Sequence, residues 1–113
     1  MAVRTITKEN FEQEVLACKK PVLLLFMTES CEDSKKQLLL WKKMAEELEG
    51  SVIFGVVDVN QSVGLAFQYQ IMDTPTIVAM SYGIFRGRVK GIQTEEEIKK
   101  MIADCGDGTF QIS

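Results

Sequence analysis

The residues of this chain that could carry out chemistry are its three cysteines, Cys18, Cys31 and Cys105. The chain has no histidine, which excludes imidazole ligands and imidazole bases and so removes most zinc sites and every Cys–His or Ser–His pair. The three thiols are odd in number and widely spaced, so we expect free thiols in a reducing cytoplasm. The candidate chemistry is therefore that of a thiol, and we expect no cofactor and no metal.

Cys31 occupies the most favourable position for a reactive thiol. The apolar run from Val22 to Met27 predicts a buried strand, and a short polar break then leads to Cys31 and a long amphipathic pattern. The thiol is therefore expected at the first turn of a helix, where free backbone N–H groups and the helix dipole stabilise a thiolate. Two lysines favour the thiolate and three nearer carboxylates disfavour it: Lys35, Lys36, Glu29, Glu32 and Asp33.

The elements that must position Cys31 follow from hydrophobic periodicity. Strands are expected at Val3–Ile6, Val22–Met27, Val52–Val59, Thr76–Met80 and Ile84–Val89, and helices at Glu9–Cys18, about Cys31–Leu48, Ser62–Tyr69 and Thr94 to about Asp104.

Several residues mark the ends and the buried faces of these elements. Thr7 is a candidate N-cap for the first helix, which should bury Phe11, Val15 and Leu16. Thr94 and Glu97 form a candidate capping box for the last helix. Trp41 lies on the apolar stripe of the second helix and should pack in the core; Asp58 is expected to be a turn residue, and Cys18 and Cys105 small, partly buried hydrophobic residues.

The order of elements is β-α-β-α-β-α-β-β-α, which predicts an α/β fold with a mixed sheet and helices on both faces. Ligands of such sheets gather beyond the carboxyl ends of the central strands, where Cys31 falls. The length favours a single domain over residues 1–113, with a loosely held tail over residues 106–113.

Charge and hydropathy narrow the classes of partner. A net charge of −3 is not the excess of positive charge that is typical of proteins that bind nucleic acid or an anionic membrane. The apolar runs are of strand length, so no transmembrane helix is expected, and the polar stretch from Met1 to Asn10 shows no secretory signal. We expect a cytoplasmic monomer that binds neither nucleic acid nor membrane.

The chain resembles the thioredoxin family over nearly its whole length. The resemblance is carried by an apolar strand leading to Cys31, by the strand Val56-Val57-Asp58-Val59-Asn60, by Met72-Asp73-Thr74-Pro75-Thr76 and by Lys90-Gly91. It implies the thioredoxin fold, with a central mixed five-stranded sheet flanked by four helices. It also implies a cis bond at Thr74-Pro75, beside which a peptide substrate would bind in a strand-like manner.

The chain departs from the family pattern at the site itself. The family motif Trp-Cys-Gly-Pro-Cys is replaced by Ser30-Cys31-Glu32-Asp33-Ser34. The resemblance therefore implies Cys31 as nucleophile and Ser34 as thiolate stabiliser, with Ser30, Glu32, Asp33, Thr74 and Pro75 as substrate-binding residues. The family's buried Asp, its neighbouring Lys and its helix-kinking Pro fall at Leu25, Val56 and Leu39. With Glu and Asp after the thiol, we expect the pKa of Cys31 to be lowered less than beside a Gly-Pro pair.

A lone thiol cannot complete disulfide exchange, since a second thiol must attack the mixed disulfide to release the product. Ser34 can donate a hydrogen bond but cannot attack. In the inferred fold, six residues of strand at roughly 3.3 Å each separate Cys18 from Cys31, and Cys105 lies at the same distant end. The leading interpretation is therefore a monothiol in thiol–disulfide exchange, with a protein or a low-molecular-weight thiol or disulfide as substrate.

Two other interpretations stay open. The chain could be a redox-inactive binding module that uses the Thr74-Pro75 groove to bind a protein partner. It could also resemble a monothiol glutaredoxin, because that family shares the Cys-x-x-Ser pattern and a Thr before the proline. In that family, however, Gly-Phe stands where this chain has Glu32-Asp33, and the acidic pair should repel anionic glutathione.

Overall fold

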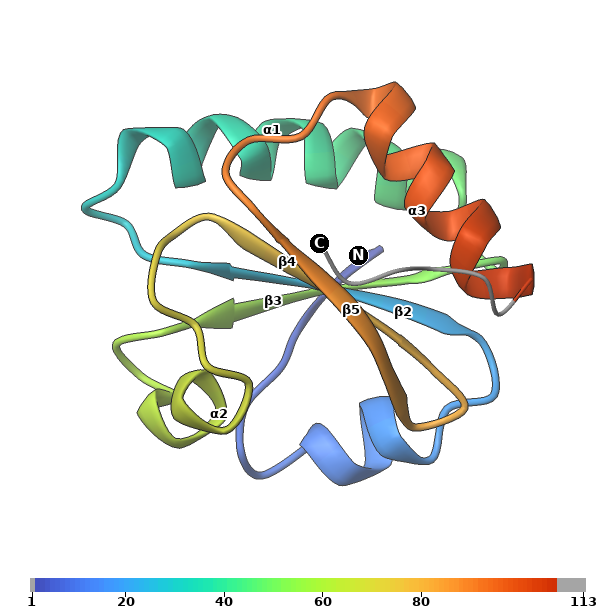
Figure 1. Cartoon of the computed structure of the whole chain (residues 1–113), viewed down its shortest axis with the longest axis horizontal. Helices are drawn as coiled ribbons and strands as arrows, with labels where there is room; N and C mark the ends of the chain where they lie inside the picture. Colours follow the sequence, from blue (N-terminus) through green and yellow to red (C-terminus); the bar gives the residue numbers. More distant parts are fainter. Residues whose placement is uncertain (1, 108–113) are drawn as a thin grey trace.

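The computed structural model of the chain describes residues 2–107. One five-stranded mixed sheet has the strand order β1-β3-β2-β4-β5. Helices α1 and α3 cover one face of the sheet, and α2 and the short helix η1 cover the other (Figure 1). This confirms the α/β fold with five strands and four helices. The elements are β1 (Val3–Thr5), η1 (Glu12–Leu16), β2 (Pro21–Met27), α1 (Glu32–Glu47), β3 (Ile53–Asp58), α2 (Val63–Gln68), β4 (Thr76–Ser81), β5 (Ile84–Lys90) and α3 (Glu95–Asp107).

Strand β2 is the centre of the sheet and belongs to both cores. It pairs in parallel with β3 and antiparallel with β4. All its residues from Val22 to Met27 are buried. Successive side chains of a strand point to opposite faces. Leu23, Leu25 and Met27 therefore pack under α1 and α3, and Val22, Leu24 and Phe26 pack under η1 and α2. Two covered faces explain why this strand is a continuous apolar run.

Helix α3 begins at the capping box that the sequence predicts. The backbone N–H of Thr94 donates to Glu97 Oε1 over 2.8 Å, and the N–H of Glu97 donates to Thr94 Oγ1 over 3.1 Å. The helix continues to Asp107, past the expected end near Asp104, and so includes residues 106 and 107, the first two of the predicted tail. The rest of the predicted tail, residues 108–113, lies outside the described residues.

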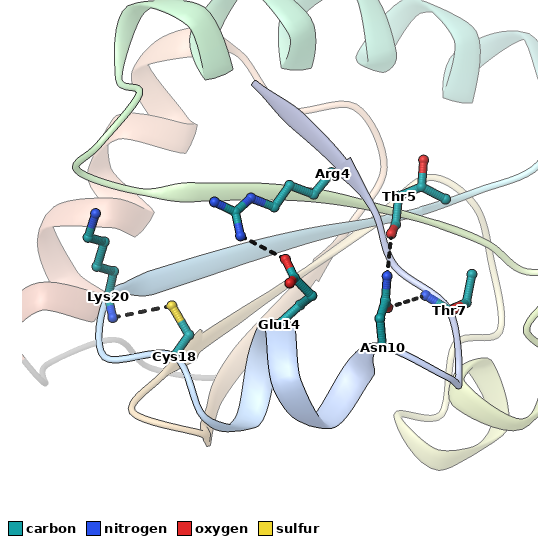
Figure 2. Close-up of polar contacts among 7 residues, drawn as sticks. All are labelled: Arg4, Thr5, Thr7, Asn10, Glu14, Cys18 and Lys20. Carbon is teal, nitrogen blue, oxygen red and sulfur yellow. Dashed lines mark hydrogen bonds and ion pairs between the residues drawn. The ribbon is translucent and has the colours of Figure 1, made fainter. Parts of the chain in front are cut away.

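The first helix is shorter than predicted. It is a single wide turn over Glu12–Leu16, closed by a bond from the N–H of Ala17 to the carbonyl of Glu12. The side chain of Asn10, not the hydroxyl of Thr7, organises the approach to this turn, as Figure 2 shows: Asn10 Oδ1 accepts from the N–H of Thr7, and Nδ2 donates to the carbonyl of Thr5. Such side-chain bonds to nearby backbone compete with a regular helical turn.

Leu16 corrects a second expectation, because its side chain is 40% exposed whereas Phe11 and Val15 are buried. The two-residue turn between β4 and β5 packs against the backbone of Leu16. A Cβ placed on Gly83 would lie 2.5 Å from the carbonyl oxygen of Leu16. The turn therefore packs closely against the backbone of Leu16, while the side chain of Leu16 lies outside the core.

This close approach makes Gly83 hard to replace. Its φ is +74°, a region that side chains rarely adopt, and its neighbour is rigid backbone. Gly83→Ala should lower the free energy of unfolding by about 1–3 kcal/mol, measured by urea denaturation. Gly50→Ala is the matched control, because Gly50 has a φ of +92° but nothing within 4 Å of an added Cβ. Equal losses in the two variants would show that the contact with Leu16 costs nothing.

Candidate functional site

Cys31 lies at the carboxyl end of β2, at the N-cap position of α1. Its N–H donates to the carbonyl of Thr28 over 3.2 Å, which closes a turn after the strand, and its own carbonyl accepts from the N–H of Lys35. The backbone of Cys31 is extended, so the helix proper begins at Glu32. The thiol is partly exposed. The predicted helix-start position of the sulfur is confirmed.

The turn before Cys31 is fixed by a contact that sequence reasoning missed. Asn60, in the loop after β3, donates from Nδ2 to the hydroxyl of Thr28 over 2.8 Å. The Asn60 N–H in turn donates to Asp58 Oδ1 over 2.9 Å, which confirms Asp58 as a turn residue. An Asn two residues after a strand suggests a turn but does not identify a partner 32 positions away. The contact ties the loops after two neighbouring strands together.

The segment around Pro75 lies against the sulfur. Cys31 Sγ is 3.4 Å from the carbonyl oxygen of Thr74, and the peptide bond between Thr74 and Pro75 is cis. The Thr76 hydroxyl donates to the carbonyl of Asp73 over 2.6 Å. Thr74 is partly buried and Pro75 is buried, so the carbonyl of Thr74 is the polar group that this segment presents to the thiol.

Ser34 lies in the first turn of α1, three residues after Cys31. Its side chain is fully buried on the inner face of α1, and its Oγ has no hydrogen-bond partner of ordinary geometry. A buried hydroxyl without a partner is costly, and a thiolate is an acceptor that would satisfy it.

The pKa of Cys31 is lowered from its ordinary value. The largest cause is the hydroxyl of Ser34; the N–H of Ser34 comes next, and smaller contributions come from the Thr74 side chain and the N–H of Asp33. Burial acts in the opposite direction. The thiol can also donate to the Thr74 carbonyl, which favours the neutral form, but that contact is long at 3.4 Å and the several donors outweigh it. Repulsion by the nearby carboxylates is not among the causes.

Comparison with known proteins agrees with this geometry. A family model described as thioredoxin matches residues 2–104. The chain belongs to the thioredoxin family. It is 26% identical over 103 residues to thioredoxin from Alicyclobacillus acidocaldarius, covering 91% of this chain and 97% of that protein. It is 25% identical over 93 residues to mitochondrial thioredoxin from Mus musculus, covering 82% of this chain and 56% of that protein.

A third relative is longer than this chain. Bloodstream-specific protein 2 from Trypanosoma brucei brucei is 30% identical over 97 residues, which cover 86% of this chain and 19% of that protein. The chain thus spans just over half the length of the mouse mitochondrial thioredoxin that it matches, and about a fifth of the length of the trypanosome protein.

The other predicted substrate-binding residues of this thioredoxin-family chain flank Cys31 in the sequence. Ser30, Glu32 and Asp33 are exposed. The Ser30 hydroxyl lies 3.3 Å from that of Thr28, and the Glu32 carboxylate pairs with Lys35 at 3.6 Å. All three residues are thus open to solvent, and the side-chain contacts of Ser30 and Glu32 are with Thr28 and Lys35.

The other two thiols lie at the far end of β2. Cys18 precedes this strand and accepts from the N–H of Lys20 over 3.5 Å (Figure 2). Cys105 is buried with its sulfur 3.5 Å from the carbonyl of Met80, which pairs with the first part of β2, and burial raises its pKa. The seven-residue strand spans roughly 20 Å. Disulfide formation needs Cα atoms within about 7 Å, so neither thiol is near Cys31.

One buried polar residue near the site was missed. Gln37 is 1% exposed on the inner face of α1; its Oε1 accepts from the N–H of Gln93 over 2.6 Å, and its Nε2 donates to the carbonyl of Gln93 over 3.2 Å. The sequence did contain a signal, because Ser34 and Gln37 precede Trp41 at helical spacing on one face. The pair of bonds fixes α1 to the loop that precedes α3.

Proposed function

We propose that this chain is a monothiol of the thioredoxin family that exchanges thiols and disulfides through Cys31. The observation that carries the proposal is a partly exposed sulfur beside an unpartnered, buried hydroxyl, that of Ser34. That hydroxyl and the free N–H groups of the helix start all stabilise the same species, a thiolate. The family relationship supports a thiol–disulfide redox role.

In the proposed first step, the Cys31 thiolate attacks one sulfur of a substrate disulfide. A bond forms between Cys31 Sγ and that sulfur, the substrate S–S bond breaks, and the second substrate sulfur leaves as a thiolate that takes a proton from water. The stabilisation of the thiolate by the hydroxyl and N–H of Ser34 is lost as the charge leaves Cys31. The product is a mixed disulfide between Cys31 and the substrate. Cys31 and the substrate taken together have been neither oxidised nor reduced.

In the second step an external thiol completes the exchange. A low-molecular-weight or protein thiolate attacks the substrate sulfur of the mixed disulfide, and Cys31 leaves as the thiolate that Ser34 again stabilises. Cys18 and Cys105 support this assignment by their distance, since both lie at the far end of β2. A partly exposed free thiol is suited to a reducing compartment, which we take to be the cytoplasm, and we propose that the chain acts there as a monomer.

The test is the reactivity of Cys31 followed by peptide-resolved mass spectrometry. The rate at which iodoacetamide labels Cys31 should rise with pH, because the thiolate is the reactive form. The midpoint of this rise should lie below the ordinary thiol pKa of about 8.5. Ser34→Ala removes the largest cause of the lowered pKa of Cys31, so the labelling midpoint of Cys31 in this variant should shift to higher pH. Ser30→Ala is the matched control, since that hydroxyl bonds to Thr28 and not to the sulfur.

The same samples test exchange directly. A small neutral disulfide such as 2-hydroxyethyl disulfide should add one mercaptoethanol group to Cys31, and an added thiol should remove it. Cys31→Ser should form no such adduct at the site. Unchanged exchange by Cys31→Ser, or a Cys31 midpoint at or above about 8.5, would end the proposal.

Exposed apolar residues favour a second candidate, a redox-inactive binding module. Met72 is 85% exposed and Ile92 is 44% exposed, and a bond from the N–H of Gly91 to the carbonyl of Pro75 brings their two loops together. Apolar groups on a surface often mark protein contacts. For a module of this kind, Cys31→Ser would keep the partner and Met72→Asp would lose it.

A further inference from the structure

Strand β5 is an edge of the sheet, and its outer side is uncovered. The strand order ends at β5, and within residues 2–107 it pairs only with β4. It is seven residues long. An edge strand presents a row of unpaired N–H and C=O groups that an extended peptide can complete. The edge is therefore a surface on which a further strand could add.

A groove lies at the carboxyl end of this strand, beside the start of β4. Its volume is about 610 Å³, within the range of ligand-binding cavities. It is bordered by the loop before β4 on one side and by the loop after β5 on the other. It is lined by Arg88, Val89 and Lys90 from the strand, Thr76 from the start of β4, Gln70 and Met72 from the first loop, and Gln93 from the second.

The groove is basic in a chain whose net charge is −3. Within the described part of the chain, Arg88 is in no ion pair. Lys90 pairs with Asp73 at 3.7 Å, but both side chains are about two-thirds exposed, so water screens the pair and a competing carboxylate can replace it. The two cations are thus available to a negatively charged ligand.

The register of β5 determines which side chains of a bound strand would lie opposite the two cations. Arg88 pairs with Val78, which belongs to the core under α2, whereas Val89 pairs with Ile77 and packs against the core under α1 and α3. Arg88 and Lys90 therefore point to one face and Val89 to the other. A strand added to this edge would place alternate side chains opposite the two cations, with the intervening side chain beside Val89.

We propose that the outer edge of β5 binds an extended segment of a partner protein with an acidic–apolar–acidic pattern. The two acidic side chains lie opposite Arg88 and Lys90, and the apolar one contacts Val89. A second copy of this chain fits less well, because antiparallel pairing of two β5 strands would place cations close to cations. The binding does not use Cys31 and stands independently of the proposed thiol exchange.

The experiment uses the full chain carrying Cys31→Ser, which removes thiol reactions, and three fluorescein-labelled octapeptides. The first is Ser-Glu-Val-Glu-Val-Glu-Val-Ser, the second has the same composition as Ser-Glu-Glu-Glu-Val-Val-Val-Ser, and the third has Lys in place of every Glu. Fluorescence anisotropy measures binding. Amide chemical shifts from NMR spectra locate it. The alternating acidic peptide should bind, and the shifted amides should be those of β5.

Charge reversal tests the assignment of the cations. Arg88→Glu should weaken binding of the alternating acidic peptide by about tenfold or more. Lys19→Glu changes the net charge equally at an exposed residue outside the groove, and should leave the affinity unchanged. No binding up to about 1 mM, equal binding of the shuffled or the lysine peptide, or an equal effect of Lys19→Glu would overturn the proposal. The cations would then serve only to keep the edge from aggregating.

Discussion

The Ser34→Cys variant should release its substrate from the mixed disulfide by itself, whereas the natural chain should stop at a mixed disulfide until an external thiol arrives. The introduced thiol would stand three residues after Cys31, where the buried hydroxyl of Ser34 already acts on the sulfur. It would attack Cys31 Sγ in the mixed disulfide, which releases the substrate as a thiolate and leaves a disulfide between positions 31 and 34 that dithiothreitol then reduces. We expect turnover to rise by at least about 100-fold at low external thiol, because an intramolecular group acts at a very high effective concentration.

The measurement is the rate of reduction of a fluorogenic peptide disulfide, with dithiothreitol at limiting concentration. Ser30→Cys is the matched control, because it places a thiol beside Cys31 on the exposed side of the turn. If the natural chain already turned over as fast as Ser34→Cys, its thiol would have a resolving partner. If neither variant gained activity, the position of Ser34 beside the sulfur would be of no use for exchange.

Trp41→Ala should lower the free energy of unfolding by about 3–5 kcal/mol, a large part of the stability of a domain of this size. Trp41 is fully buried between α1 and the sheet. Its indole N–H donates to the carbonyl of Gly55 over 3.0 Å. Its ring packs edge to face against that of Phe54, with 5.0 Å between the ring centroids. The change removes a large apolar side chain, a buried hydrogen bond and a ring contact together.

Urea denaturation followed by circular dichroism measures this loss. Trp41→Phe should cost less, about 1–3 kcal/mol, because it keeps an aromatic ring but loses the donor to Gly55. It also gives a readable result if Trp41→Ala fails to fold. Leu39→Ala on the same helix is the control, since that side chain is 71% exposed and should change stability by no more than about 0.5 kcal/mol. A loss below about 1 kcal/mol for Trp41→Ala would contradict the packing described.

Features set by local chemistry could be predicted from the sequence. The apolar run of β2 required a strand covered on both faces, and Thr94 with Glu97 specified the start of α3. The position of Cys31 followed from the same reasoning, because a strand, a polar break and an amphipathic helix leave one place for the sulfur. In each case the deciding residues lie within a few positions of one another.

Features set by distant partners could not be predicted. The turn at Gly83 packs against the backbone of Leu16, and the two residues are 67 positions apart in the chain. The contact of Asn60 with Thr28 joins two loops, and the bonds of Gln37 join a helix to a loop 56 positions later. The groove beside β5 requires the sheet register and two loops at once.

The placement of β2 in both cores has a consequence for how the molecule denatures. Strand β2 contributes side chains to the core under α1 and α3 and also to the core under η1 and α2. Neither core can therefore unfold while the other stays folded. Loss of structure should be cooperative over the described residues. The single tryptophan lies in one layer only, yet its fluorescence should follow the whole transition.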